Sequence, residues 1–298
     1  GAGNLTGEPR RFNCETNGVS GYIKFFDPYI YREPIEFKSE AEATKYYLAK
    51  LREQIIYENP ETVAAIECET ITGSNGCIIP PDGYLQGIRD ICDEFGIMMI
   101  CDEVMMGWGR TGEYFAFQNW DVKPDLVSFA KGVTCGYAPL GGVIVSKKIA
   151  EYFDDHKLLC GLTYSGHPLS CAAGVATLDV YKEEKLVENS KAMGKILGEI
   201  LEELKRKHPC VGDVRYKGLF SALELVKDKA TKEPLVEYNS DPDNTMGKII
   251  GSLKKKGFST YSHENCIIVA PPLIIKEDEL RAAMDIMDEV LGEVDKMI

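Results

Sequence analysis

The stretch IMMICDEV, residues 97–104, decides how the fold is read, because a short apolar run ends directly at two carboxylates. Three more runs are equally short and apolar: VAAIE at 63–67, LVSFA at 126–130 and GGVIV at 141–145. Strands that are buried on both faces have this composition. A helical segment lies between two of them, from Tyr84, in a PPDGY turn, to Phe95, before a terminating Gly96. This alternation predicts an α/β fold with a mostly parallel sheet flanked by helices.

The pattern changes after residue 165. Pro168 is placed to start a helix, since proline suits the first helical position. Further helical patterns and strand-like runs follow it, at 193–204, 218–226, 265–272 and 280–294. We therefore expect two domains, a large one over 1–185 and a small C-terminal α+β domain over 186–298.

Composition excludes several classes of function. The 298 residues carry a net charge of −13 and no cluster of Lys and Arg, so nucleic-acid binding is not expected. No apolar stretch is long enough to cross a bilayer, and the N-terminal GAGNLTGEPRRF lacks the apolar core of a signal peptide. Ten scattered cysteines without a C-x-x-C pair favour reduced thiols and a cytoplasmic protein. The candidate metal ligands lack the spacing of a zinc site: His156, Cys160, His167, His263 and Cys266.

Asp102 and Lys131 each follow an apolar run, at the strand ends where α/β sheets bind ligands. Taken alone, Asp102 fits a helix cap or a surface acid equally well, and Lys131 fits a lysine that reaches solvent. Together they indicate pyridoxal phosphate, because that cofactor needs a carboxylate at its ring nitrogen and a lysine at its aldehyde. We expect Lys131 to be buried, since desolvation favours the neutral amine that forms a Schiff base.

Four linked motifs make the interpretation more specific: CDEVMMGWGRTGEYFAFQ at 101–118, PDLVSFAKG at 124–132, APLGGV at 138–143 and TYSGHPLSCAA at 163–173. Their order and spacing resemble the class III aminotransferases, the ω-amino-acid branch of the fold type I enzymes. The resemblance extends over nearly the whole chain. The stretch ETITGSNGCIIPPDGY at 69–84 is most similar to the taurine:pyruvate and related ω-amino acid:pyruvate enzymes.

This resemblance implies a role for each matching residue. Asp102 pairs with the pyridine nitrogen, and Lys131 holds the cofactor aldehyde and then moves protons. Val104 packs on one face of the ring. Thr163 reaches the phosphate of the neighbouring subunit's cofactor, which implies a homodimer at minimum. Glu69 matches an acid near the cofactor. The implied reaction moves an amino group from an ω-amino acid or amine, similar to taurine or β-alanine, to an oxo acid such as pyruvate.

The chain also departs from the family pattern. Thr70 stands where relatives commonly have proline, and Ser74 and Met105 stand where some relatives have glutamate and glutamine. Ile268 precedes the VAPP turn, near the place of a frequent arginine, so the residue that binds a carboxylate is not identified. Family chains are also longer at the N-terminus, where a glycine/serine loop cups the phosphate and an aromatic side chain stacks on the ring.

Three alternatives remain open. Gly107 to Gly112 fits the dinucleotide fingerprint G-x-G-x-x-G, although a single match of this kind is weak. A chain that lacks the phosphate cup is expected to bind cofactor weakly, and is then a non-catalytic, dimerising part of such an enzyme. Racemases and mutases share the fold and begin from the same lysine-bound cofactor.

Overall fold

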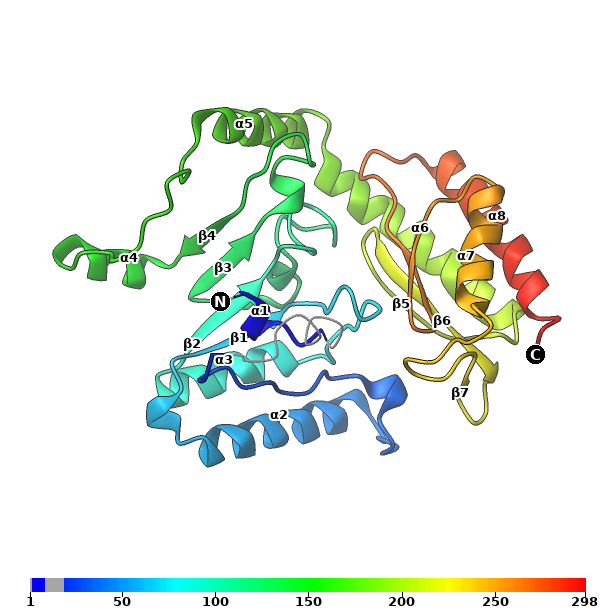
Figure 1. Cartoon of the computed structure of the whole chain (residues 1–298), viewed down its shortest axis with the longest axis horizontal. Helices are drawn as coiled ribbons and strands as arrows, with labels where there is room; N and C mark the ends of the chain where they lie inside the picture. Colours follow the sequence, from blue (N-terminus) through cyan, green and yellow to red (C-terminus); the bar gives the residue numbers. More distant parts are fainter. Residues whose placement is uncertain (1, 9–18) are drawn as a thin grey trace.

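The computed structural model describes residues 2–8 and 19–298, and two sheets organise the described chain (Figure 1). The first sheet has the strand order β1-β2-β3-β4, with bounds Ala65–Glu69, Met98–Asp102, Leu126–Phe129 and Gly142–Val145. Strands β1, β2 and β3 run parallel, and β4 is antiparallel to β3. The sheet is therefore mostly parallel, as predicted.

Helices α2 (Glu40–Tyr57) and α3 (Tyr84–Phe95) pack together, and α3 packs on β2. Figure 1 shows the pair lying along one side of the first sheet. Ser39 caps α2, since its hydroxyl accepts a hydrogen bond from the Glu42 amide. Gly96 ends α3 in the left-handed conformation, with a φ of +69°, which confirms the expected glycine terminator. The buried face of α2 is a stripe at helical spacing: Ala43, Tyr47, Leu51 and Ile55.

The expectation that all four apolar runs are buried on both faces is wrong for β4. Val143 is 58% exposed, and Ile144 and Val145 are also exposed. Strand β4 pairs on one side only, so it is an edge of the sheet. Local composition does not distinguish an edge strand from a central one, because both consist of apolar and β-branched residues. Helix α4 (Lys147–Asp155) follows β4 and projects from the body of the chain in Figure 1.

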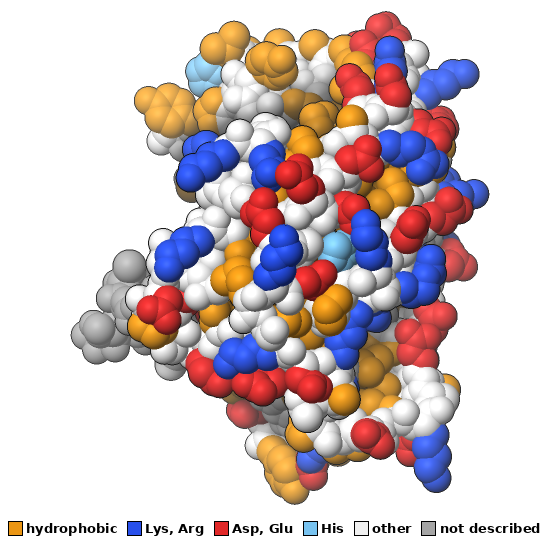
Figure 2. Space-filling view, turned by 90° about the vertical axis from the view of Figure 1, so that its right-hand side faces the viewer, with side chains coloured by type: hydrophobic (Ala, Val, Ile, Leu, Met, Phe, Trp, Pro, Cys, Tyr) orange, Lys and Arg blue, Asp and Glu red, His pale blue; other side chains and the backbone are white. Residues whose placement is uncertain are grey.

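The second sheet is antiparallel and has the order β5-β6-β9-β8, with β7 paired to β6. The bounds of β5 to β9 are Val211–Lys217, Phe220–Asp228, Glu233–Pro234, Ser262–His263 and Cys266–Val269. Sequence periodicity indicated only β6 and β9. Three helices pack beside this sheet: α6 (Leu186–Lys207), α7 (Thr245–Lys255) and α8 (Glu277–Val294). Space-filling Figure 2 shows positive and negative side chains interspersed on the face at this end of the molecule.

Helix α5 (Pro168–Glu183) begins at the predicted proline. It is separated from α6 by Lys185, whose φ of +52° breaks the helix. This break supports a domain boundary near 185, which stays a prediction, because the hydrophobic clusters cross it. Trp108 and Val133 pack with the C-terminal core, and Phe220 packs with the N-terminal core.

The remaining helices are short: α1 (Ala2–Leu5) and the 3-10 turns η2 (Ile30–Arg32), η3 (Pro60–Thr62), η4 (Ala116–Trp120) and η5 (Lys131–Val133). Within residues 2–8 and 19–298, no helix is long and apolar enough to cross a membrane. The same residues contain no group of three or more potential metal ligands.

Candidate active site

The carboxyl ends of the parallel strands bring three polar residues together. Glu69 on β1 is in register with Asp102 on β2, and Asp102 is in register with Ser128 on β3. Oδ1 of Asp102 accepts a hydrogen bond of 2.8 Å from the Val104 amide, and the described residues give Oδ2 no hydrogen bond. At this edge of the sheet, the Asp102 carboxylate is therefore held in one orientation by the turn that follows it.

Lys131 follows on the same edge, at the start of η5 directly after β3. Its backbone is in the left-handed region, with a φ of +44°, which is uncommon for a residue with a Cβ. The expectation that Lys131 is buried is wrong for the described chain, in which its side chain is exposed. Lys131 begins a turn beyond the strand end, so the sheet and its covering helices do not enclose it.

A cavity of about 190 Å³ opens beside Lys131. Its wall combines the turn after β2, helix α5 and the start of β6, contributed by Met105, Trp108, Arg110, Tyr181 and Phe220. Two polar atoms nearby, Ser128 Oγ and Trp108 Nε1, are buried without a hydrogen-bond partner among the described residues. Since buried polar atoms are normally paired, these two fit a site for a polar ligand.

The carboxyl group of Glu69 has a perturbed pKa at this edge. Burial raises the pKa of its carboxyl to about 7, a hydrogen bond from the Gly73 amide opposes the rise, and the nearby Asp102 and Asp27 add to it. That bond is 2.9 Å long, from the Gly73 nitrogen to Oε2. Glu69 therefore titrates near neutral pH and also anchors the loop that follows β1.

The chain is similar to known proteins over most of its length. Residues 14–291 match the aminotransferase class-III family. The chain belongs to this family. It is 35% identical, over 93% of its length, to a taurine–pyruvate aminotransferase of Bilophila wadsworthia, and covers 60% of that protein. It is also 35% identical, over 88% of its length, to a putrescine–pyruvate aminotransferase of Pseudomonas aeruginosa, and covers 56% of it.

One solved structure is similar over almost the whole chain. It is a taurine:2-oxoglutarate aminotransferase from Bifidobacterium kashiwanohense in complex with pyridoxal phosphate and glutamate. The two chains are 49% identical with a TM-score of 0.95, and the alignment covers 99% of this chain and 66% of the other. The chain spans about three fifths of the length of the taurine–pyruvate and putrescine–pyruvate aminotransferases. The predicted resemblance and the predicted fold are confirmed.

The class III motif with Gly107 and Gly112 does not have the geometry of a dinucleotide loop. Trp108 lies in the left-handed region, and its amide donates to the Tyr114 carbonyl. No α-helix begins after the glycines within the described chain, where the next element is the 3-10 turn η4. A dinucleotide loop presents its amides at a helix N-terminus, so the fingerprint match is coincidental.

Thr163 is exposed and lies away from the cavity, between α4 and α5. A turn over 163–166 separates it from α5, of which His167 is the N-cap. Its predicted contact with a neighbouring subunit's cofactor stays a prediction. Val104 is half-buried and lies two residues after Asp102, and its packing on a cofactor ring also stays a prediction.

Sequence analysis assigned no role to Glu103, which is fully buried. Its Oε1 accepts hydrogen bonds from Thr70 Oγ1 at 2.6 Å and the Phe117 amide at 2.9 Å, and its Oε2 accepts from the Ala116 amide at 2.8 Å. Glu103 therefore ties the end of β1 to the start of η4. Thr70, which replaces the common proline, supplies one of these bonds. The alternation of side chains along an extended segment explains why Glu103 points away from the site while Asp102 does not.

Replacing Glu103 by glutamine is expected to destabilise the protein by about 2–4 kcal/mol. The amide nitrogen of glutamine would face at least one of the backbone N–H donors, which leaves a buried donor unsatisfied. The free energy of unfolding from a urea titration measures this effect. Glu113→Gln is the control, since that residue is only part of a surface pair with Lys191. Equal stability of the two variants would contradict the assigned role.

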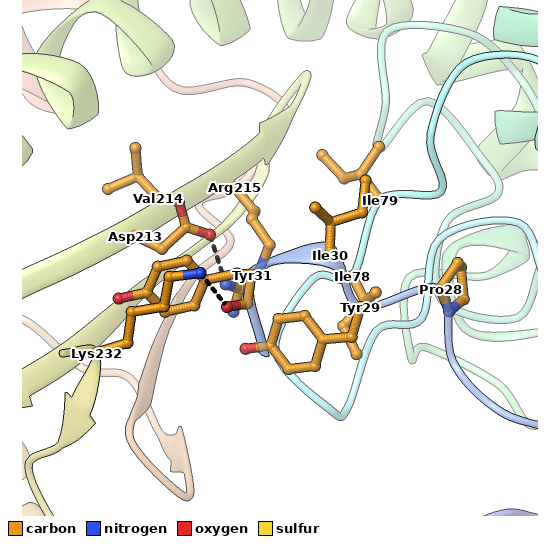
Figure 3. Close-up of a pocket in the computed structure, with 10 residues that line it drawn as sticks. All are labelled: Pro28, Tyr29, Ile30, Tyr31, Ile78, Ile79, Asp213, Val214, Arg215 and Lys232. Carbon is orange, nitrogen blue, oxygen red and sulfur yellow. Dashed lines mark hydrogen bonds and ion pairs between the residues drawn. The ribbon is translucent and has the colours of Figure 1, made fainter. Parts of the chain in front are cut away.

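A larger cavity, of about 370 Å³, lies away from Lys131 (Figure 3). Figure 3 shows Arg215 of β5 and Tyr29 and Tyr31 of the N-terminal segment around it. Arg215 Nη1 donates to Asp213 and Glu224, and its Nε donates to the Gly76 carbonyl at 2.9 Å. Burial would raise the pKa of Glu224, but Arg215, the Tyr29 hydroxyl and Arg32 hold it below its ordinary value. Glu224 pairs with Arg215 and Arg32, so the network joins the two sheets, while the buried hydroxyl of Tyr31 has no hydrogen-bond partner among the described residues.

Proposed function

We propose that this chain forms the larger part of a pyridoxal phosphate site in an aminotransferase. The observation that carries the proposal is the register of Asp102 with Ser128 on adjacent parallel strands, with Lys131 following at the same edge. Class III aminotransferases use this cofactor, and one similar structure contains it. The free oxygen of Asp102 and the unpaired Ser128 hydroxyl suit a polar, cationic ring edge.

The bound cofactor supplies a protonated ring that withdraws electrons from the reacting carbon. Asp102 keeps the ring nitrogen protonated, because a carboxylate close to a cation favours its charged form. The Val104 amide fixes the orientation of Asp102 through Oδ1. The side-chain amine of Lys131 would hold the cofactor, and the same amine would accept and return the proton of the substrate carbon.

The amino donor is proposed to be an ω-amino acid or amine, and the acceptor an oxo acid such as pyruvate. Relatives that act with taurine, putrescine and pyruvate by name support these two classes. We also propose a cytoplasmic location, which the unpaired state of all the cysteines in the described residues supports. A non-catalytic part of such an enzyme is the second candidate, because the chain spans only 60% of the first of these relatives.

Covalent labelling tests the proposal directly. The purified protein is mixed with pyridoxal phosphate, its visible spectrum is recorded, and borohydride then fixes any cofactor bound to a lysine. A visible band and a labelled peptide that contains Lys131 are the expected results. A label spread over several surface lysines, or no label in a form extended at the N-terminus, would refute the assignment. A band in the extended form alone would identify the second candidate.

A homodimer is expected from the surface around Thr163. Exposed apolar side chains gather on α5 and on the segment before it: Leu159 (88% exposed), Leu162 (80%), Tyr164 (80%) and Leu169 (72%). Large apolar side chains that are exposed close together are typical of a surface that contacts another protein chain. Light scattering should therefore give twice the chain mass, and Leu162→Asp should shift the protein towards monomer. Tyr57→Asp, at an equally exposed position at the end of α2, should not. A monomeric parent protein would contradict the prediction.

A further inference from the structure

Arg110 lies on the wall of the cavity that also contains Lys131. It belongs to the turn after β2, and its side chain reaches backbone atoms of the C-terminal half. Its Nη1 donates to the Leu219 carbonyl at 3.1 Å and to the Pro271 carbonyl at 2.6 Å. These two bonds hold the guanidinium in one orientation, since both acceptors are backbone atoms of the C-terminal half.

No acidic group within the described residues forms an ion pair with Arg110. By contrast, Arg215 and Arg32 both pair with Glu224. Burial of Arg110 lowers the pKa of its guanidinium, and only the weaker influence of Tyr181 and Cys135 opposes the shift. Arg110 is half-buried, and charges withdrawn from water are normally paired, so this cation lies next to Lys131 with no counter-charge among the described residues.

The nitrogen atoms of Arg110 that donate no hydrogen bond within the described residues are arranged to bind an anion. Its Nε and Nη2 form no hydrogen bond with the described residues, and neither atom is sealed from solvent. The N–H groups of Nε and Nη2 point to the same side of a guanidinium, and this pair matches the two oxygens of a carboxylate or sulfonate. Because only Nη1 donates to the backbone carbonyls, the edge of the guanidinium with Nε and Nη2 remains available for a ligand.

We propose that Arg110 binds the anionic group of both substrates, the carboxylate or sulfonate of the amino donor and the carboxylate of the oxo acid. The proposal rests on the proposed aminotransferase function and assigns its selectivity to one residue. Trp108, Tyr181 and Phe220 form part of the surrounding wall, and their apolar surface lowers the local dielectric constant, which strengthens the attraction between the two charges.

The decisive experiment compares two donors of equal length, β-alanine and n-propylamine, which differ in the carboxylate. In Arg110→Gln, kcat/KM for β-alanine with pyridoxal phosphate-loaded protein should fall about 100-fold, since one partner of a buried charge pair is lost. The value for n-propylamine should change less than about threefold, because no anion is involved. Arg206→Gln removes an equal charge from the exposed end of α6 and should change neither value.

Binding of propionate, followed by calorimetry, gives a second result that does not depend on activity. Its affinity should fall at least about tenfold in Arg110→Gln and partly recover in Arg110→Lys, which restores the charge without the paired donors. Equal losses of kcat/KM for β-alanine and n-propylamine, or an unchanged affinity for propionate, would overturn the proposal. Arg110 would then serve only to connect the two halves of the chain through its hydrogen bonds to backbone carbonyls. If the unsubstituted protein processes no amine, the proposed function fails, and propionate binding still decides the role of Arg110.

Discussion

Lys131→Ala is expected to reduce amino transfer at least about 10⁴-fold, because the change removes the covalent anchor and the proton carrier together. The measurement is a single-turnover half-reaction, in which the cofactor spectrum of the loaded protein is followed after addition of the donor. Stability should change little, since the Lys131 side chain is exposed and supports no packing in the described chain. Thermal unfolding of the same sample separates loss of activity from loss of fold.

Two further variants define what Lys131 contributes. Lys131→Arg keeps the charge but provides no free amine, so it should be as inactive as Lys131→Ala. Lys147→Ala removes an exposed lysine at the start of α4 and should retain full activity. Added methylamine should restore part of the activity of Lys131→Ala, since a small amine can carry the proton in its place. More than about one hundredth of the parent activity in unrescued Lys131→Ala would remove this residue from the mechanism.

Asp102→Asn is expected to lower kcat about 10²- to 10³-fold while cofactor affinity falls less than about tenfold. Asparagine has the same shape and can still accept from the Val104 amide, but it carries no charge to hold a ring nitrogen in its protonated form. Activity should therefore be lost more than binding. The comparison needs two measurements, the half-reaction rate at saturating donor and the dissociation constant of pyridoxal phosphate from a spectral titration.

Asp121→Asn is the matched control, since this exposed carboxylate lies in the turn after η4. A second variant, Asp102→Glu, keeps the charge and tests whether position or charge matters more. We expect Asp102→Glu to recover activity partly over Asp102→Asn. If Asp102→Asn retains the kcat of the parent protein, the carboxylate does not serve the ring nitrogen, and the assignment of the whole strand edge is wrong.

Much of the arrangement at this edge could be predicted because it depends on local signals. A buried parallel strand is a short apolar run, and the polar residue that follows it must lie at the sheet edge where ligands bind. That reasoning identified Asp102 and Lys131, and the register of β2 and β3 brings their strand ends together. Helix boundaries at Gly96 and Pro168 were equally predictable, since glycine and proline act through their own backbone geometry.

Other features depend on which distant segments meet, and local patterns do not contain that information. The strand β4 has the composition of an interior strand but lies at an edge, and β5 has no apolar run that distinguishes it. The roles of Glu103 and Arg110 depend on partners that are distant in the sequence. Glu103 accepts hydrogen bonds from Thr70 and from the start of η4. Arg110 donates to the carbonyls of Leu219 and Pro271. Exposure of Lys131 likewise follows from its position in a turn beyond the strand.

The amino-acid sequence by itself therefore determined the fold class, the family and the two residues expected to hold the cofactor. These conclusions rest on strand ends, turn residues and motif spacing, all of which act over a few neighbouring positions. Only the tertiary structure decided that Glu69 is half-buried beside Asp102, that Glu103 is a structural acid, and that Arg110 faces the cavity of Lys131 with no counter-charge among the described residues. The physical reason is that burial, and with it the state of a charged group, is set by contacts between segments far apart in the chain.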